Sequence, residues 1–129
     1  MTYSRSNEQY REGSTPIIHL QLYKQERGRV TKKLSLADLS TLTLTYFNQI
    51  SGSVLNSRNA QNVKNANDVT VTADCEIIWK LTATDTTCSD TTIEDDKLEK
   101  HVALFEWALA NGMKGSTRVP VYVIRDSKV

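Results

Sequence analysis

The sequence predicts an α+β fold, in which an antiparallel β-sheet with an N-terminal hairpin carries one long amphipathic helix on one face. Three observations predict it. Residues 68–85, DVTVTADCEIIWKLTATD, alternate between apolar and polar side chains, as half-buried strands do. Residues 17–38 hold two further alternating runs around a short loop. Residues 92–111 instead repeat apolar side chains at helical spacing.

The length and composition of the chain bound its class. At 129 residues the chain is expected to form a single domain, residues 1–129. Its formal net charge of +1 gives no strong overall field that would attract nucleic acid or a membrane surface. No run approaches the roughly 18 apolar residues of a membrane span, and the polar N-terminus is unlike a signal peptide. A soluble protein made in the cytoplasm is therefore expected.

The N-terminal part is expected to be a flexible arm followed by a hairpin. Residues 1–15 are polar and end just before Pro16. The run IIHLQLYKQ then places Ile18, Leu20 and Leu22 on one side of a strand. After Gly28, which can adopt positive φ in a turn, the sequence alternates again up to residue 38. The two runs together predict the hairpin.

The middle of the chain predicts strands interrupted by an asparagine-rich segment. Residues 41–48 are interpreted as a strand because Thr at every second position makes a poor helix interior, and Leu42, Leu44 and Tyr46 then share a face. The asparagine-rich residues 56–67 are either a polar loop or a weak strand. The long alternating run that follows would span roughly 60 Å if extended, so a bend or bulge near residues 74–76 is expected.

One helix is predicted over residues 92–111. Thr91 and Glu94 have the spacing of a capping box at its start, and Gly112 follows its end, as a C-terminal cap does. Its apolar stripe consists of Leu98, Val102, Phe105 and Leu109. The last run, RVPVYVIRD, predicts a strand, and Pro120 within it implies an edge position because proline has no N–H to donate.

A second copy of the chain is expected to cover part of the sheet. A helix covers about 10 Å of sheet width, whereas five or six strands spaced nearly 5 Å apart are about twice as wide. Two-fold pairing of identical subunits is the commonest way to cover such a face. We therefore predict a homodimer whose interface includes Val102, Phe105 and Leu109 of the helix. The alternative is that the N-terminal arm and the asparagine-rich loop fold over the gap.

The sequence matches no familiar catalytic motif, and we expect neither an enzyme nor a cofactor or metal site. His19 and His101 are more typical of surface or packing histidines than of general bases. The carboxylates of residues 94–96 are explained by their place in the first helical turn, where the helix dipole favours negative charge. An enzyme that uses Glu94 or Asp95 with His101 is the alternative, and it requires these side chains to converge in a pocket.

The two cysteines, Cys75 and Cys88, have no metal-ligand or redox spacing. Two free thiols in a reducing compartment are expected, and a structural disulfide between them is the alternative.

Some basic and hydroxyl side chains share polar faces of the predicted strands. Lys33 shares a face with Thr31 and Ser35, and Lys80 lies beside Thr82. Such a face can contact phosphates and base edges of nucleic acid. An ordinary solvated face of an antiparallel sheet has the same composition, and composition alone favours that interpretation.

The order of these patterns resembles the coat proteins of single-stranded RNA bacteriophages. The hairpin IIHLQLYKQERGRVTKKLSLAD is similar to the opening hairpin of that family. The segment WKLTATDTTCSDTTIEDDKLEKHVALF is similar to the strand and acidic stretch that lead into the amphipathic helix of the family. The resemblance covers about two-thirds of the chain. The family ends in two helices, whereas this chain has one predicted helix followed by a strand.

The resemblance implies a structural capsid protein of a virion, made in the host cytoplasm, which dimerises and assembles into a shell. Its polar sheet face would bind genomic RNA, and the positions expected to do so are Lys33, Arg58, Lys64, Lys80 and Thr82. The expected partners are a second copy of the chain and RNA, without a membrane. The alternative is a small phage or bacterial accessory protein, an inhibitor or adaptor, that binds a protein partner through its sheet.

Overall fold

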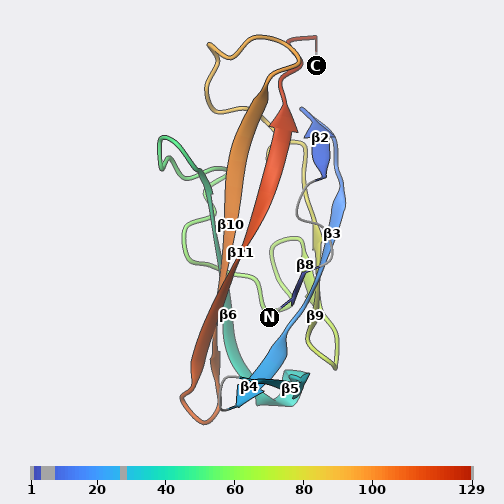
Figure 1. Cartoon of the computed structure of the whole chain (residues 1–129), viewed down its shortest axis with the longest axis vertical. Helices are drawn as coiled ribbons and strands as arrows, with labels where there is room; N and C mark the ends of the chain where they lie inside the picture. Colours follow the sequence, from blue (N-terminus) through green and yellow to red (C-terminus); the bar gives the residue numbers. More distant parts are fainter. Residues whose placement is uncertain (1, 4–7, 27–28, 129) are drawn as a thin grey trace.

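The chain folds into two β-sheets that pack face to face (Figure 1). The computed structural model describes residues 2–3, 8–26 and 29–128. In spatial order, the four-stranded sheet consists of β1 (Thr2–Tyr3), β3 (Ile17–Gln21), β9 (Glu76–Lys80) and β8 (Val69–Val71). The five-stranded sheet consists of β2 (Gln9–Arg11), β11 (Lys114–Ile124), β10 (Leu98–Leu109), β6 (Leu39–Asn48) and β7 (Gln61–Asn62). A separate hairpin consists of β4 (Tyr23–Glu26) and β5 (Arg29–Lys33).

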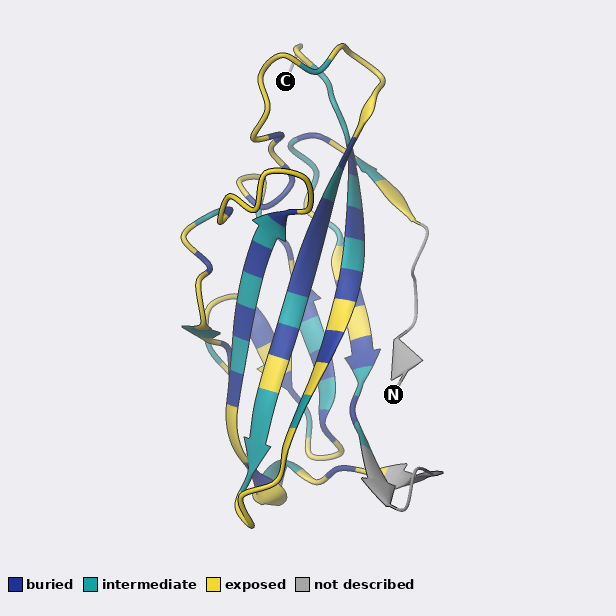
Figure 2. Cartoon of the chain, turned by 60° about the vertical axis from the view of Figure 1, so that its left-hand side comes forward, coloured by how far each residue is buried: buried dark blue, intermediate teal, exposed yellow. Residues whose placement is uncertain are grey.

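The apolar core lies between the two sheets. The ring of Trp79 on β9 packs edge-on against rings of the opposite sheet, with centroids 5.2 Å from Tyr46 and 5.9 Å from Phe105. Alternate residues of both sheets supply the rest of the core, including Ile18, Leu20, Leu42, Leu44, Ile77, Val119, Val121 and Val123. The resulting alternation of buried with half-buried or exposed residues runs along β6 and β11 (Figure 2). On β10 it is interrupted, because residues 101–103 are all buried. Each sheet therefore covers the apolar face of the other.

This architecture corrects the α+β expectation, because the protein is almost entirely β. The described residues contain no α-helix, and the short 3-10 turn η1 (Leu36–Asp38) is their one helical element. Residues 91–97, predicted to begin the helix, form turns, and residues 98–109 are β10. Both edges of β10 are hydrogen-bonded, to β6 and to β11. The ladders on both sides satisfy the backbone N–H and C=O groups of this segment, so a helix would gain no additional backbone hydrogen bonds.

The sequence of the predicted helix also fits a strand. Phe105 and Leu109 occupy the inward face of β10 under either period, whereas Val102 lies on the opposite face. Gly112 has φ of +89°, as expected of a C-terminal cap, but it serves the turn between β10 and β11 instead. The prediction was wrong because the apolar positions of this run satisfy two periods at once.

The predicted break in the long alternating run is confirmed. β8 and β9 pair as an antiparallel hairpin, with Val69 opposite Trp79 and Val71 opposite Ile77. Cys75 adopts φ of +57° in the turn between the two strands. Because the chain reverses there, the alternating run covers a face two strands wide rather than one strand of great length.

The strand predicted over residues 41–48 is confirmed within β6, and Leu42, Leu44 and Tyr46 are buried on one face of it. The asparagine-rich segment combines the two alternatives, since it is mostly loop but contains β7, which pairs with β6. Asn is suited to this loop because it tolerates the positive φ values seen at Asn56 and Asn65.

The N-terminal part is a hairpin preceded by segments that join the sandwich. The predicted hairpin is confirmed only in part. β4 pairs with β5, but residues 17–21, expected in its first strand, form β3 and enter the four-stranded sheet beside β9. Gly28, expected in its turn, lies outside the described residues. Of the expected arm of residues 1–15, residues 1 and 4–7 lie outside the described residues. β2 pairs in parallel with the end of β11, and the buried carboxylate of Glu12 accepts hydrogen bonds from the N–H groups of Cys88 and Asp126. Residues 9–12 are therefore anchored to the domain.

The C-terminal strand is confirmed as β11, and no described residue pairs with Pro120 on the side of the strand that faces β2. β2 pairs with β11 only at Tyr122–Ile124. The carbonyl of Ile124 accepts a hydrogen bond from Glu12 N, so alternate residues back to Pro120 direct their backbone groups to this same side. The N–H group that Pro120 lacks would point to this side, where no strand of the described chain has a carbonyl to accept its hydrogen bond.

Candidate functional site

Two features of the sandwich are candidates for function. The first is a buried polar cluster between the sheets, defined as Tyr46, Arg58, Asp85, Glu99 and His101, all of which are at most 4% exposed. The second is the outer face of the five-stranded sheet, defined as the outward side chains of β6, β10 and β11.

Arg58 and Asp85 form an ion pair inside the protein. Arg58 Nε donates to Asp85 Oδ1 at 2.7 Å, and Nη2 donates to Oδ2 at 2.9 Å. The guanidinium also donates to Gln61, Asp68 and the carbonyl of Asn67, and it lies 5.7 Å above the ring of Trp79. Such bidentate pairing satisfies both charges in a low-dielectric interior. This pair ties the asparagine-rich loop to the turn that follows β9.

The environment of Asp85 holds its pKa below the ordinary value. Burial alone would raise the pKa, but the hydrogen bonds from Arg58, Thr82 N–H and Asn56 outweigh it by favouring the carboxylate. Asp85 is therefore ionised at neutral pH, and its charge is neutralised by Arg58.

Next to this pair, His101 lies in a chain of hydrogen bonds. His101 Nε2 is 2.5 Å from Glu99 Oε1, and Nδ1 is 2.8 Å from the hydroxyl of Tyr46, which lies 2.9 Å from the carbonyl of Asp85. Burial lowers the pKa of His101, although the carboxylate of Glu99 opposes this. In the neutral ring, Nε2–H donates to Glu99. The single hydroxyl proton of Tyr46 can then serve either the carbonyl of Asp85 or Nδ1 of His101, but not both at once.

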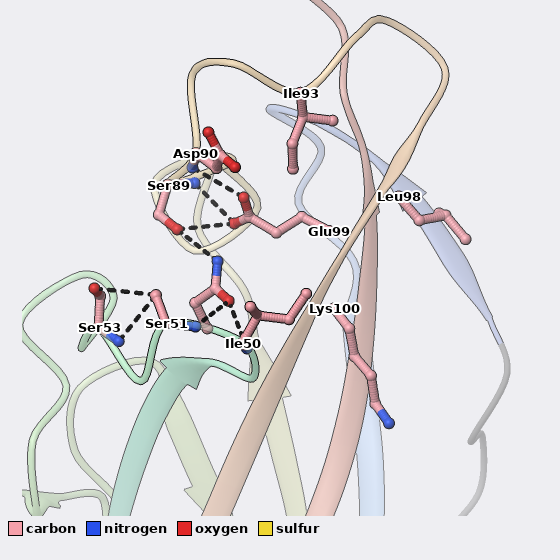
Figure 3. Close-up of a pocket in the computed structure, with 10 residues that line it drawn as sticks. Ile50, Ser51, Ser53, Ser89, Asp90, Ile93, Leu98, Glu99 and Lys100 are labelled. Atoms are coloured by element: carbon pink, nitrogen blue, oxygen red, sulfur yellow. Dashed lines mark hydrogen bonds between the residues drawn. The ribbon is translucent and has the colours of Figure 1, made fainter.

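The carboxylate of Glu99 is also held by the loop that precedes β10. It accepts hydrogen bonds from the N–H groups of Ser89 and Asp90 and from the hydroxyl of Ser89 (Figure 3). Burial raises the pKa of Glu99, but these donors and His101 bring it below the ordinary value. The cluster is internally satisfied, which fits a structural role better than proton transfer to a substrate.

A pocket of about 260 Å³ lies beside this loop, at the end of the sandwich where the segments before β10 and after β6 meet (Figure 3). Its lining includes Ile50, which is 94% exposed, together with Ser51, Asp90 and Leu98. The buried polar side-chain atoms that lack a partner belong to Ser14, Trp79 and Thr117, none of which lines the pocket. Nothing in its lining therefore requires a bound ligand.

The residues expected to bind RNA do not form one surface. Arg58 is 1% exposed and engaged as described above. Lys33 ends the β4–β5 hairpin, and Lys80 ends β9 on the outward side of the other sheet. Lys64 donates to the carbonyl of Leu39, and Thr82 exchanges hydrogen bonds with Asp85. The polar strand faces that were expected to carry them are divided between the β4–β5 hairpin, the end of β9 and the turn that follows β9.

The residues expected at a dimer interface fall on both sides of β10. Phe105 is 1% exposed in the core between the sheets, and Leu109 packs against the same core. These positions serve the chain's own second sheet, which removes the argument that a lone helix leaves the sheet uncovered. Val102 lies on the other side of the strand, outside the cluster between the sheets, and is nevertheless buried, with 6% of its surface exposed.

The outer face around Val102 is apolar for a sheet surface that faces outward. The apolar side chains at its centre are Phe47, Val102, Leu104, Pro120 and Tyr122, of which Val102 is buried and the other four are half-buried. Leu98, Ala108 and Ile124 lie towards its ends. The pairing register makes the central side chains neighbours, since Val102 lies opposite both Phe47 and Pro120. Arg118 lies 5.9 Å above the ring of Phe47, and Lys100 lies 5.7 Å above that of Tyr122. Sequence analysis missed this face, because its central side chains come from three strands separated by up to 75 residues.

The alternative of an enzyme that uses Glu94 or Asp95 with His101 finds no support in the geometry. Glu94 and Asp95 are exposed, and Asp95 accepts hydrogen bonds from Ser127. His101 is 0% exposed and contacts Glu99 instead. Within the described ranges, no group of three or more His, Cys, Asp or Glu side chains is arranged to hold a metal ion.

Cys75 and Cys88 are free and buried, as expected. A search of the described residues finds no helix that is long and apolar enough to cross a membrane.

The fold and these two features define an all-β sandwich with an internally satisfied polar cluster and an apolar outward sheet face. Comparison with known proteins adds no relative, since no family model, no curated protein and no solved structure matches the chain.

Proposed function

We propose that this chain is a non-catalytic structural subunit that self-associates through the outer face of β6, β10 and β11. The observation that carries the proposal is the contiguous apolar and aromatic surface around Val102, on a sheet side where water would favour polar residues. Contiguous apolar patches on a soluble protein mark sites of interaction. Aromatic side chains accompanied by Arg are also typical of the centre of protein interfaces.

The opposite sheet provides an internal comparison. Its outward side chains include His19, Gln21, Glu76 and Lys80, so its surface is mostly polar. The two sheets have the same inward pattern but different outward ones. Because both are parts of one chain in the same solvent, the apolar character of one outer face supports a specific partner for that face.

The non-catalytic part of the proposal is supported by the buried polar cluster. Its histidine and carboxylates are enclosed by the sandwich and bonded to one another. A shell of many copies, as the resemblance to coat proteins implies, is one form of such self-association and stays a prediction. Electron microscopy of the concentrated recombinant chain tests it through the presence or absence of particles.

Sedimentation velocity of the purified chain, from low micromolar to several hundred micromolar, tests the proposed function. We expect concentration-dependent association that Leu104→Asp weakens at least tenfold, because a carboxylate would be buried at the centre of the interface. Ile17→Asp is the matched control, since Ile17 is an exposed apolar residue (49%) on the outward side of the other sheet. A chain that stays monomeric at every concentration would contradict the proposal.

A further inference from the structure

The outer face carries opposite charges at the two ends of an apolar centre. On β10, Lys100 and Glu106 lie on the same side of the strand as Val102 and Leu104, which separate them. The β10–β6 register places Val102 opposite Phe47, and the β10–β11 register places Lys100 opposite Tyr122. Along the outward side of this strand the order is therefore positive, apolar, apolar, negative.

We infer that a second copy of the chain packs on this face and is related to the first by a two-fold axis. The axis lies in the plane of the interface, runs perpendicular to β10 and passes over that strand at Ala103. The inference rests on the proposed self-association and names its geometry. The rotation makes facing strands antiparallel, so that Lys100 meets Glu106 of the second copy and Val102 meets Leu104. Because the interface is isologous, the ion pair forms twice.

The charges distinguish this arrangement from the other simple two-fold. An axis along β10 would place Lys100 against Lys100 and Glu106 against Glu106 of the second copy. Like charges brought together at an interface cost several kcal/mol, whereas complementary charges fix the register of association. The charge pattern therefore favours the antiparallel arrangement, which pairs opposite charges, over the parallel arrangement, which pairs like charges. Arg118, stacked on Phe47, has no acidic partner in the proposed register and takes no part in this argument.

The size of the face suits a weak dimer. A strand of 12 residues is about 40 Å long and three strands are about 14 Å wide, which gives about 560 Å² on each copy and about 1,100 Å² in total. Specific interfaces begin at about 1,000 Å² of total buried area, and weak ones lie at that end of the range. We therefore expect association in the micromolar range rather than an obligate dimer.

Charge reversal in sedimentation experiments tests the register. We expect Lys100→Glu and Glu106→Lys each to weaken self-association at least tenfold, because each places two pairs of like charges across the interface. An equimolar mixture of the two variants should regain most of the association that each variant loses, since at positions 100 and 106 one copy then carries only carboxylates and the other only ammonium groups. The double variant K100E/E106K should likewise regain self-association.

The mixture separates the register from other effects of the substitutions. Lys100→Glu also removes the cation from the ring of Tyr122, a loss that mixing does not repair. Recovery in the mixture therefore reports only the charges that face each other. Lys80→Glu, an exposed reversal on the opposite sheet, is the matched control and should leave association unchanged.

The possible failures are distinguishable. If the wild type associates and Leu104→Asp disrupts it, but either reversal has no effect or the mixture does not recover, the register is overturned and the proposed function stands. If the wild type does not associate at all, the proposed function fails and the register fails with it.

Discussion

Asp85 holds the guanidinium of Arg58 through two parallel hydrogen bonds in the interior, with 2.7 Å between Nε and Oδ1 and 2.9 Å between Nη2 and Oδ2. The two residues are 27 positions apart and come from two loops at the ends of strands in opposite sheets. Around this pair, Trp79 and Tyr46 pack edge-on. The sandwich is therefore closed at this point by an ion pair as well as by its apolar core.

Arg58→Met is expected to destabilise the protein by about 3–5 kcal/mol, because it leaves the carboxylate of Asp85 buried without its cation. Urea denaturation measures this loss. The double variant R58M/D85N should lose less unfolding free energy than the two single variants together, because it removes both charges of the pair and leaves no unpaired one. Lys80→Met, at an exposed position, should change stability by less than about 0.5 kcal/mol. A loss below about 1 kcal/mol in Arg58→Met would show that the pair is not structural.

The stability of the protein should fall between pH 7 and pH 5 because of His101. Burial lowers the pKa of His101 in the folded state, so the folded ring stays neutral where the unfolded ring, with a pKa of about 6.5, is protonated. The unfolded state then binds more protons, and the free energy of unfolding decreases as the pH falls. Denaturation midpoints in urea at pH 7, 6 and 5 measure this slope.

His101→Gln should flatten that slope, whatever its effect on stability at pH 7. Equal slopes in the wild type and in His101→Gln would show that the buried ring does not control stability in this range.

The thiol of Cys88 should be unreactive in the native protein. Burial, followed by the nearby carboxylates of Glu99 and Glu12, raises its pKa to about 12, and the residue is 4% exposed. Because the thiolate is the reactive form, alkylation at pH 8 should be slow in buffer and rapid in strong denaturant. Mass spectrometry after timed iodoacetamide treatment measures both rates. Rapid native labelling of Cys88 would contradict its place in the interior.

Gly115 should not tolerate a larger residue, because it packs against Trp107 across the β10–β11 ladder. A Cβ at Gly115 would lie 2.6 Å from Cε2 and Cζ2 of the indole, well inside van der Waals contact. We expect Gly115→Ala to cost about 1–3 kcal/mol, as overpacking does. Trp107→Leu should relieve this clash, so the double variant should lose less than the sum of the singles in thermal unfolding. Additive losses would contradict the close contact.

Several elements of the fold were predictable from local sequence. The strand around Leu42, Leu44 and Tyr46 was correct because β-branched neighbours and strict alternation agree. The break before Glu76 followed from the length of the alternating run. By contrast, residues 98–109 satisfy both a helical and a strand period, so local sequence alone does not choose between them.

The candidate site was less predictable than the fold. Arg58 lies in a polar loop and has the local sequence of an exposed residue, yet Asp85 draws it into the interior. His101 was expected to be either a surface or a packing histidine, and its hydrogen bonds to Glu99 and Tyr46 explain how it is accommodated in the interior. The outer face joins Phe47, Leu104 and Tyr122, which no sequence period connects.

Local sequence was sufficient to predict the alternation of β6, the break between β8 and β9, and the C-terminal strand that contains Pro120. These properties depend on backbone preferences and on side chains within a few positions of each other. Three features instead depend on the assembled fold: residues 98–109 form a strand, a second sheet covers the core, and apolar side chains lie on the outer face of β6, β10 and β11. Those outcomes depend on hydrogen-bond ladders and contacts between segments far apart in the chain, whose formation no local pattern specifies.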